Sequence, residues 1–124
     1  MKKSEKAIIE QLFKKLLAQE IWAFPERGGP LSIPCKHGVY IIRKGKSVLH
    51  VGRTLRGKNG LRQRLSNHLH GQSSFTIKYF KGVGRKLRKG HTYQYLEVRS
   101  SRQRALLENY AVGSLCPKHL GLGE

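Results

Sequence analysis

The chain has 124 residues, a length typical of a single domain. Its 25 lysines and arginines outnumber its 7 acidic residues, which are all glutamates, and the formal net charge at pH 7 is +18. An EF-hand loop or a two-metal carboxylate cluster needs several acidic side chains close together, so both are excluded. Because this charge repels itself in a compact fold, we expect a polyanionic partner, usually nucleic acid. A membrane surface or an acidic protein is the alternative.

The sequence has no run of about 18 apolar residues, so no transmembrane helix is expected. Its two cysteines, Cys35 and Cys116, lack the spacing of metal ligands, and we expect both to be reduced packing residues. We therefore expect a cytoplasmic, nucleoid-associated protein without membrane attachment.

The first 30 residues predict an amphipathic helix followed by a linker. Apolar side chains recur with helical periodicity over residues 4–22, and Ser4 is a suitable N-cap. The prolines and glycines of residues 25–30 predict a loop. We therefore divide the chain into an N-terminal helix with its linker, residues 1–30, and a core domain, residues 31–124.

The core predicts alternating strands and helices. The expected elements are strands at 38–43 and 48–52 joined by a hairpin turn at 44–46, a helix at 61–70, a basic loop at 81–90, a strand at 92–98 and a helix at 102–115. Residues 73–80 are ambiguous, with a short strand as the first interpretation. The order strand–strand–helix–strand–helix predicts an α+β sandwich.

Tyr40 and His50 lie ten positions apart on the two hairpin strands. If the turn centres on Gly45, the two side chains face each other at a cross-strand separation of about 4.5–5.5 Å. An imidazole beside a phenol can take or share its proton. The alternative is a tyrosine and a histidine packed on a half-buried sheet.

Two predicted helices carry further candidates. Arg64 and His68 share a helix face, where an arginine can stabilise phosphate charge and a histidine can bind the phosphate or a water. Glu108 lies among apolar neighbours in the last helix, and a single carboxylate with waters and phosphate oxygens is a plausible magnesium site. The alternatives are a solvated helix face for the first pair and an ion pair with Arg104 for Glu108.

Basic side chains cluster in the loops and on the second helix. Those at 81–90 are expected to hold a DNA backbone rather than to read bases, because flexible lysines act as point charges, although a merely solvated loop is the alternative. The predicted nucleic-acid-binding residues are Arg53, Arg56, Lys58, Arg62, Lys81, Arg85, Lys86, Arg88 and Lys89. The remaining histidines, His37, His70, His91 and His119, form no ligand cluster in the sequence.

Several of these residues together resemble the GIY-YIG nuclease family. Gly38-Val39-Tyr40 resembles its first motif, and His50-Val51-Gly52 stands where the second motif is expected. Arg64 aligns with the family's catalytic arginine, His68 falls where some members carry a histidine, and Glu108 aligns with its metal-binding glutamate. The likeness extends over nearly the whole core.

The resemblance implies a three-stranded antiparallel sheet flanked by helices, and hydrolysis of DNA phosphodiesters with one Mg²⁺ or Mn²⁺ ion. Tyr40 and His50 would activate water, Arg64 would stabilise the phosphate charge, and His68 would orient the phosphate or the water. Glu108 would bind the metal. DNA is the expected substrate ahead of RNA, and a homodimer or a partner protein could supply specificity.

Two positions depart from the family pattern. His50 stands where a tyrosine is usual, and the late asparagine is expected near Leu120. A neutral imidazole remains a competent proton acceptor near pH 7. The loss of the asparagine favours the main alternative, a catalytically degenerate nucleic-acid-binding module of the same fold. A basic, ribosome-associated structural protein is the third possibility.

Overall fold

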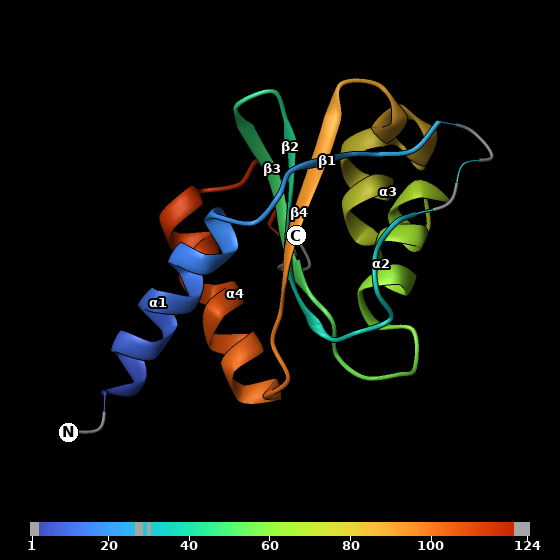
Figure 1. Ribbon diagram of the computed structural model, residues 1–124. Helices are drawn as coiled ribbons and strands as arrows, with labels where there is room; N and C mark the ends of the chain where they lie inside the picture. The colour runs from blue at the N-terminus through green and yellow to red at the C-terminus, as the bar shows by residue number, and fades with distance from the viewer. Residues whose placement is uncertain (1–2, 27–28, 30, 121–124) are drawn as a thin grey trace.

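The computed structural model describes residues 3–26, 29 and 31–120. The elements are the helix α1 (Glu5–Leu17), the strands β1 (Trp22–Ala23), β2 (Gly38–Lys44) and β3 (Ser47–Arg53), the helices α2 (Gly60–Leu69) and α3 (Ser74–Phe80), the 3-10 helix η1 (Gly84–Arg88), the strand β4 (His91–Glu97) and the helix α4 (Ser101–Leu115). Helices α1 and α4 cover one face of an antiparallel sheet, and α2 and α3 lie on the other side (Figure 1). The predicted α+β class is confirmed.

The central strand β2 divides the core into two apolar clusters. Tyr40 and Ile42 contribute to the cluster that α2 and α3 complete, whereas Val39 and Ile41 contribute to the cluster shared with α1 and α4. Side chains of one strand point alternately to opposite faces, so a strand covered on both sides reads as a continuous apolar run. The edge strand β3 is bonded to β2 alone in the strand order β1-β4-β2-β3.

The sheet has four strands, so the expected three-stranded sheet is wrong in this detail. The additional strand β1 pairs with β4, with Trp22 opposite Tyr93. It arises because α1 ends at Leu17 rather than at residue 22. The buried side chain of Gln94 donates hydrogen bonds to the carbonyls of Leu17 and Gln19 at 3.4 and 3.1 Å, which satisfies backbone groups that a further helical turn would have used.

The amphipathic helix α1 packs on the protein's own core. Ser4 caps it, as expected, and Ile9 and Leu16 are buried in the cluster that contains Val39 and Leu107. The division at residue 30 stays a prediction. Among the residues that the structure describes, no helix is long and apolar enough to cross a bilayer.

Residues 74–80 form a helix, not a strand. The Ser73 hydroxyl accepts a hydrogen bond from the Thr76 backbone N–H, and the Thr76 hydroxyl accepts one from the Ser73 backbone, which makes a capping box. This local signal outweighs the strand propensity of the aromatic residues. A second correction concerns the cysteines, because Cys35 and Cys116 are exposed free thiols rather than packing residues.

Candidate active site

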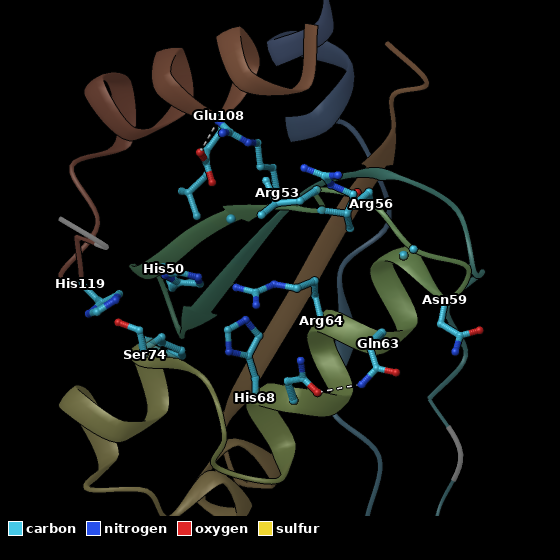
Figure 2. Close-up of a pocket in the computed structure, with 18 of the residues that line it drawn as sticks. His50, Arg53, Arg56, Asn59, Gln63, Arg64, His68, Ser74, Glu108 and His119 are labelled. Carbon is cyan, nitrogen blue, oxygen red and sulfur yellow. Dashed lines mark hydrogen bonds and ion pairs between the residues drawn. The ribbon is translucent and has the colours of Figure 1, made fainter. Parts of the chain in front are cut away.

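A cavity of about 790 Å³ runs along the edge strand β3. Side chains of β3, α2, α3 and α4 line it together with the loop over residues 54–59 and with His119 (Figure 2). We call the part around Tyr40, His50, His68 and His119 the histidine end, and the part around Arg53 and Glu108 the carboxylate end. β3 contributes a side chain to each end, because side chains from both faces of an edge strand can reach the same cavity.

The predicted cross-strand pairing of Tyr40 with His50 is wrong in register. A bulge near Ile42 shifts the hairpin, so that Tyr40 pairs with Gly52 and His50 pairs with Ile42. The two side chains still meet diagonally, with 3.5 Å between the Tyr40 hydroxyl and His50 Nε2. Gly52 makes this possible, since a Cβ atom there would overlap the Tyr40 hydroxyl.

His68 makes the shorter contact with Tyr40. Its Nε2 lies 2.7 Å from the Tyr40 hydroxyl, and its Nδ1 lies 2.6 Å from the Ser73 hydroxyl. The Ser73 hydroxyl in turn lies 2.9 Å from that of Thr76. The structure therefore brings Tyr40, His50 and His68 together, as the sequence predicts, and adds Ser73 and Thr76. The Ser-x-x-Thr spacing of a capping box is the signal that would have placed both hydroxyls at one helix start.

His119 also joins the histidine end, although sequence reasoning had set it aside. Its ring lies 5.2 Å from that of His50, centroid to centroid, and its backbone N–H donates to the Leu49 carbonyl at 2.9 Å. Phe75 stacks on His50 at 4.7 Å with 7° between the ring planes. The segment after α4 thus brings a histidine to the region where the family pattern leads one to expect an asparagine near Leu120.

Burial keeps the rings of Tyr40, His50 and His68 neutral at pH 7. It raises the pKa of Tyr40 to about 12, a rise that the charge and a hydrogen bond of Arg64 oppose. It lowers the pKa of His50 to about 3, and the charges of His119 and Arg64 add to this effect. For the same reason the pKa of His68 lies well below its usual value. These imidazoles can therefore accept protons but carry no charge.

Arg64 reaches into the cavity from α2, and its guanidinium is directed towards His50 (Figure 2). Its Nε is buried and has no hydrogen-bond partner among the described residues. A buried N–H donor without an acceptor is costly, so a water or a ligand oxygen that binds in the cavity would stabilise this atom. A phosphate oxygen satisfies both the donor and the charge.

At the carboxylate end, Glu108 accepts a hydrogen bond from Arg53 at 3.1 Å. Burial raises the pKa of the Glu108 carboxyl, whereas the charges of Arg53 and Arg64 oppose the rise. Arg104, the alternative partner considered from sequence, donates instead to backbone carbonyls. Its acceptors are Thr54 at 3.2 Å, Leu55 at 3.1 Å, Val98 at 3.0 Å and Arg99 at 2.8 Å.

The loop over residues 54–59 is held in place at the cavity mouth. Besides the bonds from Arg104, His37 contacts the Thr54 hydroxyl at 2.7 Å and the Gly57 carbonyl at 3.0 Å. This fixed backbone carries Arg56 and Lys58 along the lining of the cavity. Two of the nine predicted DNA-binding residues are thereby placed beside the candidate site, and Arg53 is a third.

The other predicted DNA-binding residues lie away from this cavity. Arg62 donates to the Ile33 carbonyl at 2.9 Å, and Arg88 donates to the carbonyls of Pro25 and Glu26 at 2.7 and 3.0 Å. Exposed basic side chains between the end of α3 and the start of β4 are those of Lys81, Arg85, Lys86 and Lys89. Their contact with nucleic acid stays a prediction.

The donor set fits a magnesium ion better than a transition metal. No group of three or more histidine, cysteine or acidic side chains within the described part of the chain could hold a metal. Mg²⁺ keeps several waters and is commonly bound by one or two carboxylates with substrate phosphate oxygens. Glu108 is a half-buried carboxylate in the wall of a cavity of sufficient size.

Comparisons with known proteins support the fold. Neither the models of known protein families nor the curated proteins gave a match. Among solved structures, the chain is similar to the GIY-YIG N-terminal endonuclease domain of UvrC from Thermotoga maritima, bound to its catalytic magnesium. The two are 23% identical with a TM-score of 0.52, over 71% of this chain and 86% of that domain. The chain has the GIY-YIG nuclease fold.

A tyrosine-to-phenylalanine variant of the same UvrC domain, also bound to its divalent cation, gives a consistent result. It is 21% identical to this chain with a TM-score of 0.50, over 88% of this chain and 93% of that domain. At this identity the likeness establishes the fold and leaves the roles of individual residues to be argued from the site.

Proposed function

We propose that this protein is a divalent-metal-dependent endonuclease that hydrolyses DNA phosphodiester bonds. The observation that supports it most strongly is the buried Nε of Arg64, a donor in need of an acceptor in a cavity with a carboxylate at one end and neutral imidazoles at the other. An anionic phosphodiester supplies that acceptor. The Arg64 guanidinium then stabilises the charge that develops on the phosphate oxygens during hydrolysis.

His50 is the better candidate for the group that takes a proton from the attacking water. The pKa of Tyr40 is raised to about 12, and its side chain is fully buried. The imidazole of His50 is neutral and lines the cavity. A phosphate anion beside the ring favours the charged imidazolium, so substrate binding raises the low pKa of His50 and makes it a stronger base.

Glu108 would hold the metal, one Mg²⁺ or Mn²⁺ ion in each site. When bound, such an ion supplies Lewis-acid stabilisation of the phosphate oxygens. Arg53 holds the Glu108 carboxylate through one oxygen and keeps it oriented towards the cavity side of β3. His68 orients the phenol of Tyr40, and through it the ring of His50.

DNA is the proposed substrate, with Arg56 and Lys58 at the mouth of the cavity and the exposed lysines and arginines over residues 81–90 as further backbone contacts. A homodimer or a partner protein would supply target specificity. A cytoplasmic, nucleoid-associated location agrees with the net charge of +18.

The test is cleavage of supercoiled plasmid DNA in Mg²⁺ or Mn²⁺ by the wild type and by Glu108→Ala. We expect the wild type to nick or linearise the plasmid, EDTA to stop it, and Glu108→Ala to lower the rate by about 10²-fold or more. Glu97→Ala is the matched control, because Glu97 is exposed on β4 and away from the cavity. Cleavage that survives in Glu108→Ala would overturn the proposed metal ligand.

The second candidate is a binding module of the same fold without catalysis. The Arg53–Glu108 ion pair favours it, because an arginine already neutralises the carboxylate that a metal would need. It predicts DNA binding with a steep salt dependence in both the wild type and Glu108→Ala, with no cleavage by either.

A further inference from the structure

We infer that Ser73 and Thr76 are positioning residues for the proposed nuclease site. A chain of hydrogen bonds runs from the start of α3 through His68 and Tyr40 to His50 and fixes which nitrogen of His50 carries the hydrogen. The His50 Nδ1 is left as the proton-accepting nitrogen. The catalytic meaning of this chain rests on the proposed function, whereas its hydrogen-bond direction does not.

The two hydroxyls at the start of α3 form the far end of the chain. The Thr76 hydroxyl donates to the Ser73 carbonyl at 3.1 Å and accepts from the Ser73 backbone N–H at 3.3 Å. The Ser73 hydroxyl accepts from the Thr76 backbone N–H at 3.2 Å and lies 2.9 Å from the Thr76 hydroxyl. If the Ser73 hydroxyl donates its hydrogen to the Thr76 hydroxyl, its oxygen has one lone pair left to accept a hydrogen bond from His68.

Tyr40 forms the middle of the chain. The guanidinium of Arg64, which can only donate hydrogen bonds, interacts with the phenol and opposes the rise of its pKa. The phenol hydrogen is then available to an imidazole. The nearest nitrogen is His68 Nε2 at 2.7 Å, whereas His50 Nε2 lies at 3.5 Å. The phenol thus donates to His68 and accepts from its other neighbours.

Only one direction of these hydrogen bonds gives every polar hydrogen an acceptor. If Tyr40 donates to His68 Nε2, then His68 Nδ1–H donates to Ser73, and His50 Nε2–H donates to Tyr40. If the direction is reversed, His50 carries its hydrogen on Nδ1, which is buried and has no hydrogen-bond partner among the described residues. A buried N–H without an acceptor is rare because it loses its hydration without compensation.

The consequence concerns His50, whose ring lines the cavity. Its Nε2 is occupied by Tyr40, so Nδ1 is the nitrogen that remains to accept a proton from a group in the cavity. A hydroxyl pair on α3 thereby sets the state of a residue on the sheet. The phenol of Tyr40 acts as a connector in this chain.

The experiment is a long-range ¹H–¹⁵N correlation spectrum of the imidazole rings in the full chain at pH 7.5, which distinguishes the two neutral tautomers. In the wild type we expect the hydrogen on Nδ1 of His68 and on Nε2 of His50. A wild-type spectrum with the hydrogen on His68 Nε2 or on His50 Nδ1 would overturn the inference without any variant.

Ser73→Ala removes the acceptor for His68 Nδ1–H. Because either direction then leaves one buried N–H without an acceptor, we expect this variant to lose the preference for the wild-type tautomers, and cleavage to fall on the order of 10-fold or more, as for other groups that orient a functional histidine. Ser73→Thr keeps the hydroxyl and the helix cap, so it should restore the wild-type tautomers and rate. Unchanged tautomers in a folded Ser73→Ala would overturn the inference.

Ser66→Ala is the matched control. Ser66 and His70 form a second serine–histidine contact, at 3.3 Å, on the exposed side of α2. Its removal should leave His50 and His68 unchanged.

The proposed nuclease function and the proposed hydrogen-bond direction can fail separately. A wild type that shows the expected tautomers but cleaves no DNA would support the hydrogen-bond direction and contradict the nuclease function. A wild type that cleaves DNA with the opposite tautomers would support the nuclease function and contradict the hydrogen-bond direction.

Discussion

The two ends of the cavity hold their functional groups in different ways. At the histidine end, His68 is fully buried, His50 is 8% exposed, and both contact neutral hydroxyls, while burial lowers the pKa of each ring. At the carboxylate end, the side chains of Arg53 and Glu108 are 30% and 21% exposed and form an ion pair. One end holds buried, uncharged rings, and the other holds an ion pair beside solvent.

This difference follows from the position of β3 at the edge of the sheet. His50 and Arg53 are three residues apart on this strand, so their side chains leave from opposite faces. His50 meets α2 and α3, whereas Arg53 meets α4. Because no further strand of the described residues covers β3, groups from both helical layers reach one cavity, and a phosphodiester bound there would contact both ends.

Arg64 interacts electrostatically with both ends, so its removal should have the largest effect. We expect Arg64→Ala to lower the rate of plasmid cleavage by about 10²-fold or more, since it removes the charge that stabilises the phosphate. Arg62→Ala is the control on the same helix, because Arg62 bonds to the Ile33 carbonyl. Equal rates for wild type and Arg64→Ala would contradict the proposal that Arg64 stabilises the phosphate charge between the two ends.

Tyr40→Phe tests the histidine end alone. The ring still fills its place in the core, but His68 loses its bond partner at Nε2 and Ser73 can no longer act on His50. We expect about 1–3 kcal/mol of lost stability in urea unfolding, together with cleavage reduced on the order of 10-fold. Magnesium affinity, measured by calorimetry, should stay the same, and a large change in it would contradict the separation of the two ends.

Acid should weaken the fold through the histidine end. Burial lowers the pKa of His50 to about 3 in the folded state, against 6.5 for the ordinary side chain. The unfolded chain therefore binds the extra proton first, and stability that is complete above pH 6.5 falls as the pH drops towards 3. His50 contributes a slope of up to about 1.4 kcal/mol per pH unit in this window.

His50→Gln should flatten this pH dependence in thermal or urea unfolding. His70→Gln is the control, since His70 is exposed at the C-cap of α2. An equal flattening by both variants would mean that burial of the histidine end is not the cause of the acid sensitivity.

The smallest effect is expected from single surface cations. Lys86→Gln removes one proposed phosphate contact, which should weaken DNA binding several-fold and lower the slope of log K against log salt by about 1. Fluorescence anisotropy at several salt concentrations measures it. No change in that slope would remove Lys86 from the proposed DNA surface.

The fold was largely predictable because its strands and helices carry clear periodicity and caps. The arrangement of the residues at the histidine end was predictable only in part. Tyr40, His50 and His68 were found from spacing, yet the bulge near Ile42 changed their register, and nothing in the local pattern shows a bulge. Strand β1 was missed because two residues carry too little periodicity, and the side chain that favours it, Gln94, is far away in sequence.

Ser73 and His119 illustrate a second limit. Ser73 was within reach of sequence reasoning through its capping box with Thr76, but its contact with His68 depends on how α2 and α3 pack. His119 follows Pro117 in a segment without regular structure, and its approach to His50 is a tertiary contact between distant parts of the chain. Such contacts depend on packing and leave no local pattern.

The measurement that most directly tests whether the two ends form one nuclease site is the rate of plasmid cleavage in Mg²⁺, with enzyme in excess, for wild type, His50→Gln, Glu108→Ala and the variant that carries both substitutions. We expect each substitution alone to lower the rate by about 10²-fold or more. We also expect the double variant to lose little beyond the worse single variant, because the groups act as a unit. Full activity in His50→Gln, or a wild type that binds DNA without cleaving it, would contradict this assignment.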